Sequence, residues 1–337
     1  LVMEAPFTLM NKLGLDTASQ IVKDFCEEHS GFSFPTSLQK FKDNGQWDIS
    51  TIVKTVQDKV AIFTLRRPKV LNALNLNVIA ELESGLLEVE NNDSILGSVI
   101  TGFGVKAFVS GADINMLAGL KTPKEGYENA RSFQVVFSRI QQMNKPIICA
   151  MNGFAFGGGN ELAMSCTMRI SKKDLPILAC QPEVNLGFIP GAGGTQRLPR
   201  LVGLDIASDI LRTGRPVSAN KAFEIGLIDK LVDGDLILEG IECVNQITNG
   251  TLPIIPMVTS SFRHGEESTK IETNHLSKAI DSILVETIYG GAEMDLEDGL
   301  EYEARQFGEC MKTEDMKIGL KNFLDNGPKV KAAFIHK

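Results

Sequence analysis

The hydrophobic and polar residues of the chain follow different patterns before and after about residue 50. In the first part the pattern predicts a short helix with Asp16 as its N-cap, and its apolar positions share one face at Ile21, Val22 and Phe25. Glycine, proline and asparagine then interrupt the pattern between residues 31 and 45. We therefore expect residues 1–48 to form a small helical appendage.

Segments of strand and helix character alternate in the next part of the chain. A strand predicted over residues 60–65 precedes an amphipathic helix over 75–91, and a strand over 96–100 precedes a helix over about 127–142. The apolar run at 146–150 then has the length and composition of a buried strand. Such alternation is typical of parallel β units, so the predicted fold class is α/β.

The later part of the chain is mostly helical. The polar stretch 248–274 is predicted to be a long loop or an irregular insertion. We place a β/α body at residues 49–240 and a helical tail at 241–337. Helices are expected near residues 204–212, 218–224, 277–287, 295–309 and 313–324.

Length and charge exclude several classes of protein. The chain has 337 residues, enough to bury a large core, and 34 Lys and Arg against 42 Asp and Glu give a formal net charge of −8. Because no extended run of Lys or Arg occurs, we expect neither nucleic acid nor a membrane as a partner. No apolar run approaches the roughly 18 residues that a membrane span needs.

The cysteine pattern indicates the compartment. Six cysteines are spread along the chain without a CxxC pair, and there are only four histidines. This spacing predicts reduced thiols instead of a disulfide framework, and it predicts no metal site. A secretory signal layout is also missing, so a cytoplasmic protein is expected. The chain enters a patterned segment directly from Leu1, which indicates that it is a fragment of something longer.

Two glycine-rich turns follow predicted strands, at residues 102–113 and 152–161. Glycine allows backbone N–H groups to approach a ligand without a Cβ atom in the way, so turns of this kind can bind oxyanions. Gly102, Gly104 and Ala107 also match a dinucleotide fingerprint superficially. That motif opens a helix directly, whereas the chain here continues as a loop, so a dinucleotide site is disfavoured.

Two glutamates lie beside the glycine-rich turns. Glu161 follows three glycines at the start of an apolar helical segment, and Glu183 precedes another glycine-rich loop at 187–194. Each has an ordinary alternative role, helix-dipole stabilisation for Glu161 and loop capping or a salt bridge for Glu183. A histidine-activated nucleophile fits poorly, because the histidines lie far in sequence from the turns and no G-x-S-x-G occurs. Carboxylates with backbone donors suit enolate chemistry.

Three longer motifs include these glycine-rich turns and acids. They are KAFVSGADI at 106–114, KPIICAMNGFAFGGGNELA at 145–163, and QPE at 181–183 with GAGGTQRLP at 191–199. In this order they resemble the enoyl-CoA hydratase/isomerase (crotonase) family, strongly over about residues 50–240 and loosely over the helical tail. The resemblance implies a crotonase-like spiral of ββα units followed by a C-terminal helical region used in trimer formation, so a homotrimer or hexamer is expected.

Matched motif to motif, the resemblance also implies site residues. The oxyanion-hole donors would be the backbone N–H groups of Ala112 and Gly158, and the catalytic pair would be Glu161 and Glu183. Residues 65–74 resemble the family's first CoA-binding loop, in which Lys69 supplies the cation. The residues implied to contact the CoA substrate are Lys69, Val70, Leu71, Ala73, Gly111, Asp113, Ile114, Phe323 and Lys329.

A second, shorter resemblance concerns the appendage. Residues 5 to about 43 resemble the C-terminal helical end of 3-hydroxyacyl-CoA dehydrogenases. This implies that the chain is the hydratase part of a fused dehydrogenase–hydratase polypeptide, with a dehydrogenase portion upstream. No NAD site is expected in the chain itself.

The resemblance implies an enoyl-CoA hydratase, which adds water syn to a trans-2-enoyl-CoA and forms a 3-hydroxyacyl-CoA. The acyl-CoA thioester is the expected partner, and no cofactor is expected because CoA belongs to the substrate. Two alternatives stay open. One is a 3-enoyl to 2-enoyl-CoA isomerase, which can move protons with a single carboxylate, and the other is a non-catalytic acyl-CoA-binding module. The presence of both Glu161 and Glu183 favours the hydratase.

Overall fold

The computed structural model describes residues 6–35, 38, 50–262 and 271–336. The chain divides into two compact units, Leu1–Ser50 and Thr51–Lys337. The first unit contains helices α1 (Pro6–Leu13) and α2 (Leu15–Glu28). We describe each unit by itself.

The predicted N-cap of the first unit's helix is wrong by two positions. Helix α2 begins at Leu15 and its N-cap is Gly14, whose φ of 82° lies in the left-handed region that favours glycine. Asp16 lies in the first turn instead, where its negative charge stabilises the positive end of the helix. Glycine therefore starts this helix through its backbone conformation, without a side-chain cap.

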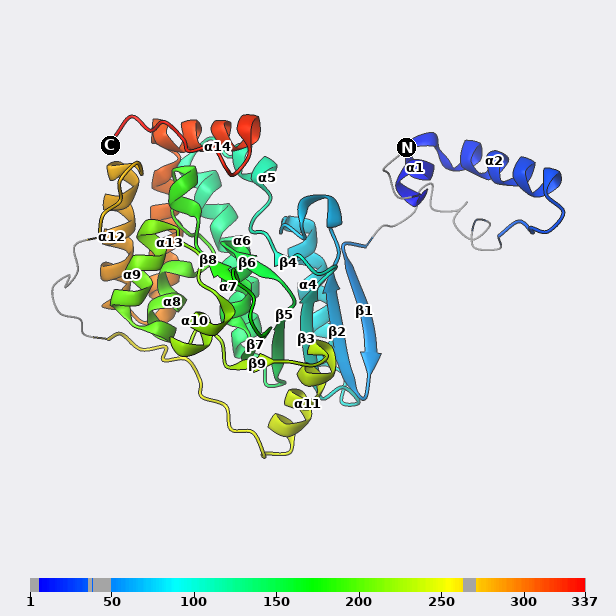
Figure 1. Ribbon diagram of the computed structural model, residues 1–337, viewed down its shortest axis with the longest axis horizontal. Helices are drawn as coiled ribbons and strands as arrows, with labels where there is room; N and C mark the ends of the chain where they lie inside the picture. The colour runs from blue at the N-terminus through cyan, green and yellow to red at the C-terminus, as the bar shows by residue number, and fades with distance from the viewer. Residues whose placement is uncertain (1–5, 36–37, 39–49, 263–270, 337) are drawn as a thin grey trace. The chain divides into compact units, whose positions relative to one another are not determined.

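The second unit is built on two sheets (Figure 1). The larger sheet has six strands in the order β1-β2-β3-β5-β7-β9, and the smaller has three in the order β4-β6-β8. Strands β1 and β2 are antiparallel, and the pairs from β2 to β9 and from β4 to β8 are parallel. The α/β class with a parallel sheet is thus confirmed. The strands are β1 (Ile52–Gln57), β2 (Val60–Leu65), β3 (Gly97–Gly102), β4 (Ala107–Val109), β5 (Ile147–Met151), β6 (Phe154–Phe156), β7 (Met168–Lys172), β8 (Ala179–Cys180) and β9 (Lys230–Val232).

From β3 onward, consecutive strands alternate between the two sheets and wind the chain into a spiral. Strands β3, β5 and β7 belong to the larger sheet, and each is followed by a strand of the smaller sheet. Helices α5 (Ile114–Ala118) and α6 (Pro123–Gln142) follow β4, helix α7 (Gly158–Ser165) follows β6, and the 3₁₀ turn η2 (Glu183–Leu186) follows β8. Because β4, β6 and β8 are parallel neighbours, the loops after them leave from one edge of the small sheet.

Strands β2, β3 and β5 of the larger sheet are buried on both faces. Phe63 of β2 packs in one hydrophobic cluster with Leu82 and Leu86 of helix α4 (Leu76–Glu90), whereas Ile62 belongs to a second cluster. That second cluster is completed by residues of helix α11 (Leu236–Thr248), among them Val244. Adjacent strand residues point to opposite faces, so both faces of a doubly covered sheet must be apolar, as the strand sequences are.

The remaining helices complete one side of the unit. Helix α13 packs against α6 and α12, and α14 packs against η2 and α5 (Figure 1). In the described residues between α11 and α12 the chain forms no helix or strand, in agreement with the predicted long loop. The remaining elements are η1 (Pro68–Val70), α8 (Gly194–Val202), α9 (Leu204–Thr213), α10 (Ala219–Glu224), α12 (Lys278–Ala292), α13 (Leu296–Cys310) and α14 (Glu314–Asn326).

Among the elements that the sequence analysis did not predict are one edge strand, three short strands and helix α11. Strand β1 is an edge strand with mostly exposed side chains, so it carries no apolar alternation. Strands β4, β6 and β8 have only three, three and two residues, which is too short for a periodic pattern. Helix α11 was also missed; it crosses the predicted boundary between body and tail at residues 240 and 241 and ends where the predicted polar stretch begins.

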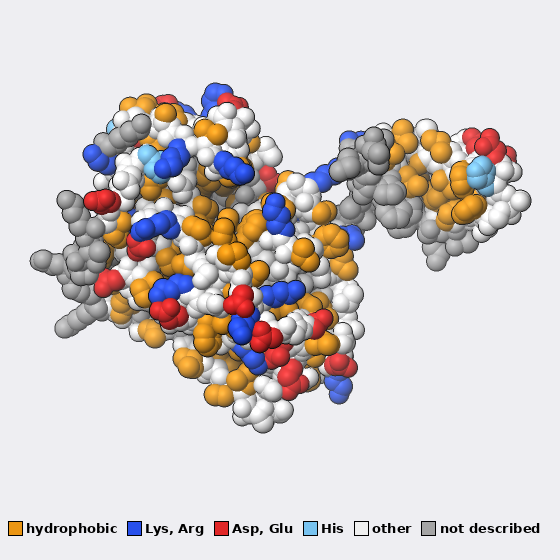
Figure 2. All heavy atoms as spheres, in the orientation of Figure 1, with side chains coloured by type: hydrophobic (Ala, Val, Ile, Leu, Met, Phe, Trp, Pro, Cys, Tyr) orange, Lys and Arg blue, Asp and Glu red, His pale blue; other side chains and the backbone are white. Residues whose placement is uncertain are grey.

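The structure excludes the dinucleotide-binding motif considered for Gly102, Gly104 and Ala107. The residues after Gly102 form a turn and then strand β4, so the glycines open no helix. The surface carries charges of both signs, interspersed on the face of the second unit seen in Figure 2. Among the helices of the described residues, none is both long and apolar enough to cross a membrane.

Candidate active site

The ends of the three short strands bring the predicted catalytic segments together. Ala112 comes three residues after β4, Gly158 two residues after β6, and Glu183 three residues after β8. Since these strands are adjacent and parallel, the three loops leave from the same edge of the small sheet. The two glycine-rich turns and Glu183 are therefore neighbours in space, although they are far apart in sequence.

The two predicted oxyanion donors lie beside each other. A Cβ atom on Gly158 would lie 3.5 Å from the backbone nitrogen of Ala112. Leu74 donates its N–H to the Gly111 carbonyl and accepts the N–H of Asp113, at 2.8 and 2.7 Å, so the Ala112 N–H between them points away from Leu74. Among the described residues, neither Ala112 nor Gly158 donates its N–H to a backbone acceptor. The two N–H groups thus belong to neighbouring segments and have no backbone acceptor among the described residues, an arrangement that suits donation to one oxygen atom.

Glu161 lies in the first turn of α7 and is buried. Its Oε1 accepts the N–H of Ala192 at 2.9 Å and that of Gly194 at 2.7 Å. A Cβ on Gly194 would lie 2.9 Å from the same oxygen, so the close approach of the loop requires glycine. Glu161 therefore does more than stabilise a helix end at the surface, since the loop before α8 holds its carboxyl group in place.

Glu183 is the first residue of η2 and is also buried. Its Oε1 lies so close to Gly157 that any side chain there would collide with it, and Gly157 has a φ of 49°. Its Oε2 has no hydrogen-bond partner among the described atoms. The carboxyl group thus lies against the turn whose next residue, Gly158, supplies a predicted oxyanion donor, and one oxygen stays available for another molecule.

Burial and mutual repulsion change the acidity of both groups. Burial raises the pKa of Glu161 well above its usual value, and the charges of Glu303 and Glu183 raise it further, against the two bonds from Ala192 and Gly194. Burial also raises the pKa of Glu183 to about 8, with a contribution from Glu303. Carboxyl groups this close release their protons as a coupled set, so at neutral pH the site holds at least one proton.

The loop predicted to bind CoA is attached to the first glycine-rich turn. The Ser110 side chain donates to the Val70 carbonyl at 2.9 Å, and its N–H donates to the Leu71 carbonyl at 3.1 Å. Arg67 joins the two segments through an ion pair with Asp113, at 2.9 Å. The structure thus places 67–74 beside 110–114, and the side chain of Lys69 is exposed on η1.

Asn72 anchors this loop from within. It is buried, has a φ of 62°, and its side-chain amide donates to the carbonyls of Phe103, Ala107 and Phe108 at 3.0 to 3.2 Å. Its side-chain oxygen accepts the N–H of Arg67 at 3.2 Å. The loop therefore depends on an amide at a left-handed position, which asparagine tolerates better than most residues.

Replacing Asn72 is expected to destabilise the protein measurably. Asn72→Ala leaves buried carbonyls without donors and keeps the strained φ, so the free energy of unfolding should fall by about 2 to 3 kcal/mol. Asn91→Ala is the control, because Asn91 is exposed and its amide reaches only the Leu87 carbonyl. Urea denaturation measures both. Equal stability losses in the two variants would show that the Asn72 bonds contribute little.

Comparisons with known proteins agree with this geometry. A family profile described as enoyl-CoA hydratase/isomerase matches residues 55–287. The chain is 36% identical over 278 residues to the short-chain-enoyl-CoA hydratase of Clostridium acetobutylicum, a match covering 82% of this chain and 96% of that protein. The chain belongs to the enoyl-CoA hydratase/isomerase family. The crotonase-like fold expected from the motifs is therefore confirmed.

A solved structure and a longer relative add to the comparison. The crystal structure of enoyl-CoA hydratase from Bacillus anthracis is 28% identical, with a TM-score of 0.55, and the match covers 84% of this chain and 100% of that one. The fatty acid oxidation complex subunit alpha of Idiomarina loihiensis is 34% identical over 278 residues, covering 77% of this chain but 38% of that protein. The same hydratase/isomerase region thus occurs in proteins of different length.

Two of the residues predicted to contact CoA, Phe323 and Lys329, are on a different part of the chain from the loops described so far. Phe323 is half-buried in α14, and Lys329 is exposed beyond the end of that helix. Helix α14 packs against α5, which follows the oxyanion turn, but neither side chain takes part in the bonds between loop 67–74 and residues 110–113. The CoA contacts of Phe323 and Lys329, like that of Lys69, stay predictions.

The structure adds residues that the motifs did not single out. The buried side chain of Gln181 lies beside Gly194, and its amide atoms have no partner among the described residues. Glu303, far along the tail, contacts the same loop from α13. A signal for Glu303 exists in the sequence, because it shares the apolar face of its helix with Leu300 and Phe307, where a charge is unusual.

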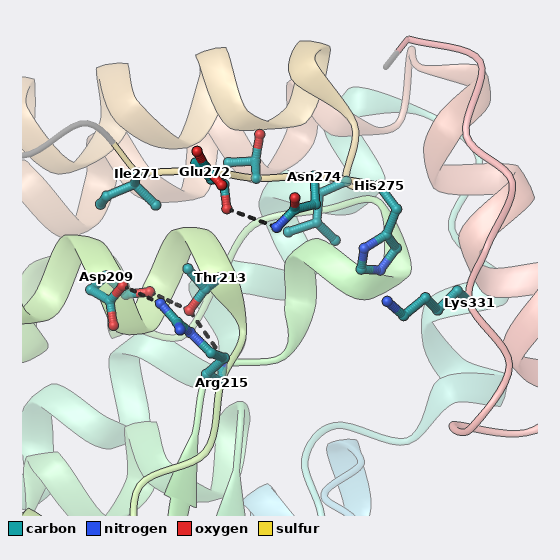
Figure 3. A pocket seen from close by; sticks show the side chains of 10 residues that line it. Asp209, Thr213, Arg215, Ile271, Glu272, Asn274, His275 and Lys331 are labelled. Atoms are coloured by element: carbon teal, nitrogen blue, oxygen red, sulfur yellow. Dashed lines mark hydrogen bonds and ion pairs between the residues drawn. The ribbon is translucent and has the colours of Figure 1, made fainter.

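A separate pocket of about 680 Å³ lies between α9, the segment before α12 and the C-terminal segment (Figure 3). Its charged lining is partly neutralised, because Arg215 pairs with Asp209 at 2.7 Å. None of its lining residues belongs to the three strand ends. The predicted chemistry therefore does not use this pocket.

Proposed function

We propose that this member of the family is an enoyl-CoA hydratase, in which Glu161 and Glu183 move the protons of water addition. The observation that carries the proposal is the juxtaposition of two buried carboxyl groups with the N–H groups of Ala112 and Gly158. Among its relatives, one named short-chain-enoyl-CoA hydratase matches 82% of this chain. A short trans-2-enoyl-CoA is therefore the proposed substrate.

The oxyanion site activates the substrate in this proposal. The thioester oxygen accepts hydrogen bonds from the N–H groups of Ala112 and Gly158, which are fixed by the bonds of Leu74 and by the start of α7. These bonds strengthen as negative charge develops on that oxygen, and each such donor typically contributes about 3 to 4 kcal/mol to lowering a barrier. Electron density leaves C3, which then accepts the oxygen of water.

We assign the two proton transfers to different carboxyl groups. Glu161 takes a proton from water as the C3–O bond forms, and the two N–H groups that donate to its Oε1 offset part of the burial that raises its pKa. Glu183, whose pKa is about 8, is protonated at neutral pH and donates to C2 through a carboxyl group whose Oε2 has no partner among the described atoms. The water supplies the hydroxyl group at C3 and leaves its proton on Glu161, while the proton of Glu183 ends on C2; transfer of one proton from Glu161 to Glu183, directly or through water, then restores the site.

The proposal is tested by following the absorbance of the conjugated enoyl thioester. Mixing the purified protein with crotonyl-CoA is expected to remove this absorbance, and the product should be 3-hydroxybutyryl-CoA. A longer 2-enoyl-CoA run in parallel measures the chain-length preference. Binding of crotonyl-CoA without loss of absorbance would contradict the hydratase, and turnover of a 3-enoyl-CoA alone would identify the isomerase.

The proposed chemistry requires only the CoA thioester and water, so we propose no resident cofactor and no metal. For the partners, we propose a homotrimer or hexamer and an upstream 3-hydroxyacyl-CoA dehydrogenase portion. The proposed dehydrogenase portion is supported by the similarity to a fatty acid oxidation complex subunit alpha, a longer protein of which the match covers 38%. All six cysteines are unpaired, which supports a reducing compartment such as the cytoplasm.

A further inference from the structure

The loop before α8, taken here as residues 192–195 and so including the first two residues of the helix, lies between two buried carboxylates. Along residues 192–195 successive N–H groups alternate between them: Ala192 and Gly194 donate to Glu161, whereas Gly193 and Thr195 donate to Glu303. The distances to Glu303 are 2.6 and 2.8 Å. Each carboxylate therefore holds one side of the same four residues, and neither can shift without moving the loop.

Glu303 is fully satisfied as a hydrogen-bond acceptor. Besides the two N–H groups, it accepts the Thr195 hydroxyl at 2.6 Å and the Gln134 amide at 3.1 Å. These four donors match the acceptor capacity of one carboxylate. Glu303 is 0% exposed, so its burial costs free energy that these bonds must offset. A fully engaged buried carboxylate is a rigid support.

A third charged side chain, Arg197, also contacts residues 192–195. The Arg197 guanidinium is buried and donates to the Ala192 carbonyl at 3.1 Å, and Gly193 leaves room for it. Arg197 thus holds a carbonyl of the loop, while Glu303 holds two of its N–H groups. These contacts also have a purely structural interpretation, because Glu303 occupies the place of a side-chain cap at the start of α8, where Gly193 provides none.

We infer that Glu303 is a positioning residue for hydration, because it fixes the loop whose Ala192 and Gly194 N–H groups hold the Glu161 carboxylate. The inference rests on the proposed role of Glu161 as the base. Glu303 itself is not expected to touch the substrate, since all its acceptor positions are occupied. A structural cap alone would affect folding, whereas a positioning residue affects turnover through Glu161.

The test is a pair of substitutions in two backgrounds. Glu303→Gln places an amide N–H₂ against N–H donors of the loop, so kcat with crotonyl-CoA is expected to fall about 10- to 100-fold, as misplacement of a reacting group by about 1 Å does. The KM should change less than about threefold, because the CoA loop at 67–74 is held by other contacts. Glu309→Gln is the matched control, on the same helix but exposed and paired with Lys312.

The decisive measurement repeats Glu303→Gln in a Glu161→Gln protein. If Glu303 acts through Glu161, it should lower the residual rate less than about threefold there, because the effects of residues acting as a unit are not additive. The same 10- to 100-fold loss in both backgrounds, or an unchanged kcat in the wild-type background, would overturn the inference. Full hydration by Glu161→Gln alone would instead overturn the proposed function.

A milder variant covers the case in which Glu303→Gln fails to fold. Thr195→Val removes the hydroxyl donor to Glu303 and keeps the shape of the side chain. It is expected to lower kcat about three- to tenfold at unchanged KM, a loss that should vanish in the Glu161→Gln background. Equal losses in both backgrounds would again show that the loop does not act through Glu161.

Discussion

Glu161→Gln is expected to lower the kcat for hydration of crotonyl-CoA by about 10³-fold, the largest single effect anticipated for this protein. The amide keeps the size of the side chain and an oxygen for the N–H groups of Ala192 and Gly194, but it cannot accept a proton from water. The KM should stay within about threefold of the wild-type value, because the CoA loop is untouched. Loss of enoyl-thioester absorbance measures both constants.

The matched control for this variant is Glu83→Gln, which removes a partly exposed carboxylate that pairs with Arg139 on the surface. It should leave hydration unchanged. The Glu161→Gln variant also tests the isomerase alternative, because isomerisation can use a single carboxylate. Glu161→Gln is therefore expected to lose hydration even if some 3-enoyl-CoA isomerisation persists, and undiminished hydration would show that Glu161 is not the base.

Glu183→Gln is expected to lower hydration to a similar degree, and it carries a distinct pH signature. With a pKa of about 8, Glu183 donates its proton below that value, so kcat/KM of the wild-type protein should fall as the pH rises through about 8. The variant should be slow at every pH and should lack this fall. A wild-type profile that stays flat to pH 10 would contradict the assignment of Glu183 as the acid.

Stability provides a measurement of Glu183 that does not depend on activity. The folded-state pKa is raised from 4.5 to about 8, so the folded protein keeps a proton that the unfolded chain releases between these values. The contribution of this group is fully present below pH 4.5 and is lost as the pH rises through about 8. Glu183→Gln should therefore gain stability relative to wild type over this interval, and a constant difference in urea melts would contradict the raised pKa.

The hydrophobic periodicity predicted the parts of the fold in which elements are long. The helix expected over residues 75–91 is α4, capped by Asn75, and the helices expected over 277–287, 295–309 and 313–324 are α12, α13 and α14, with bounds that differ by at most five residues. These elements are readable because burial of one helix face imposes a local period. The smaller sheet could not be predicted from the sequence. Its strand β8 has only two residues, and it pairs with β6, which lies more than 20 residues earlier in the chain.

The candidate site divides in the same way. The glycine-rich turns directed attention to the neighbouring Glu161 and Glu183, whereas the pairing of these two acids and the N–H groups of Ala112 and Gly158 were implied by the resemblance to the family, and their roles stay predictions. The anchoring of Asn72 could not be predicted, since the carbonyls that accept from its side-chain amide lie at least 31 residues away along the chain. Such partners are chosen by packing and leave no local pattern.

By itself, the sequence determined the α/β class and the family, because these depend on periodicity and on the order of motifs, and it predicted Glu161 and Glu183 as the two catalytic carboxyl groups. Only the tertiary structure decided that Glu303 shares a loop with Glu161, since 142 residues (303 − 161) separate them in the chain. It alone also decided the acidity of the site. A raised pKa comes from burial and from neighbouring charges, and both exist only after the chain has folded.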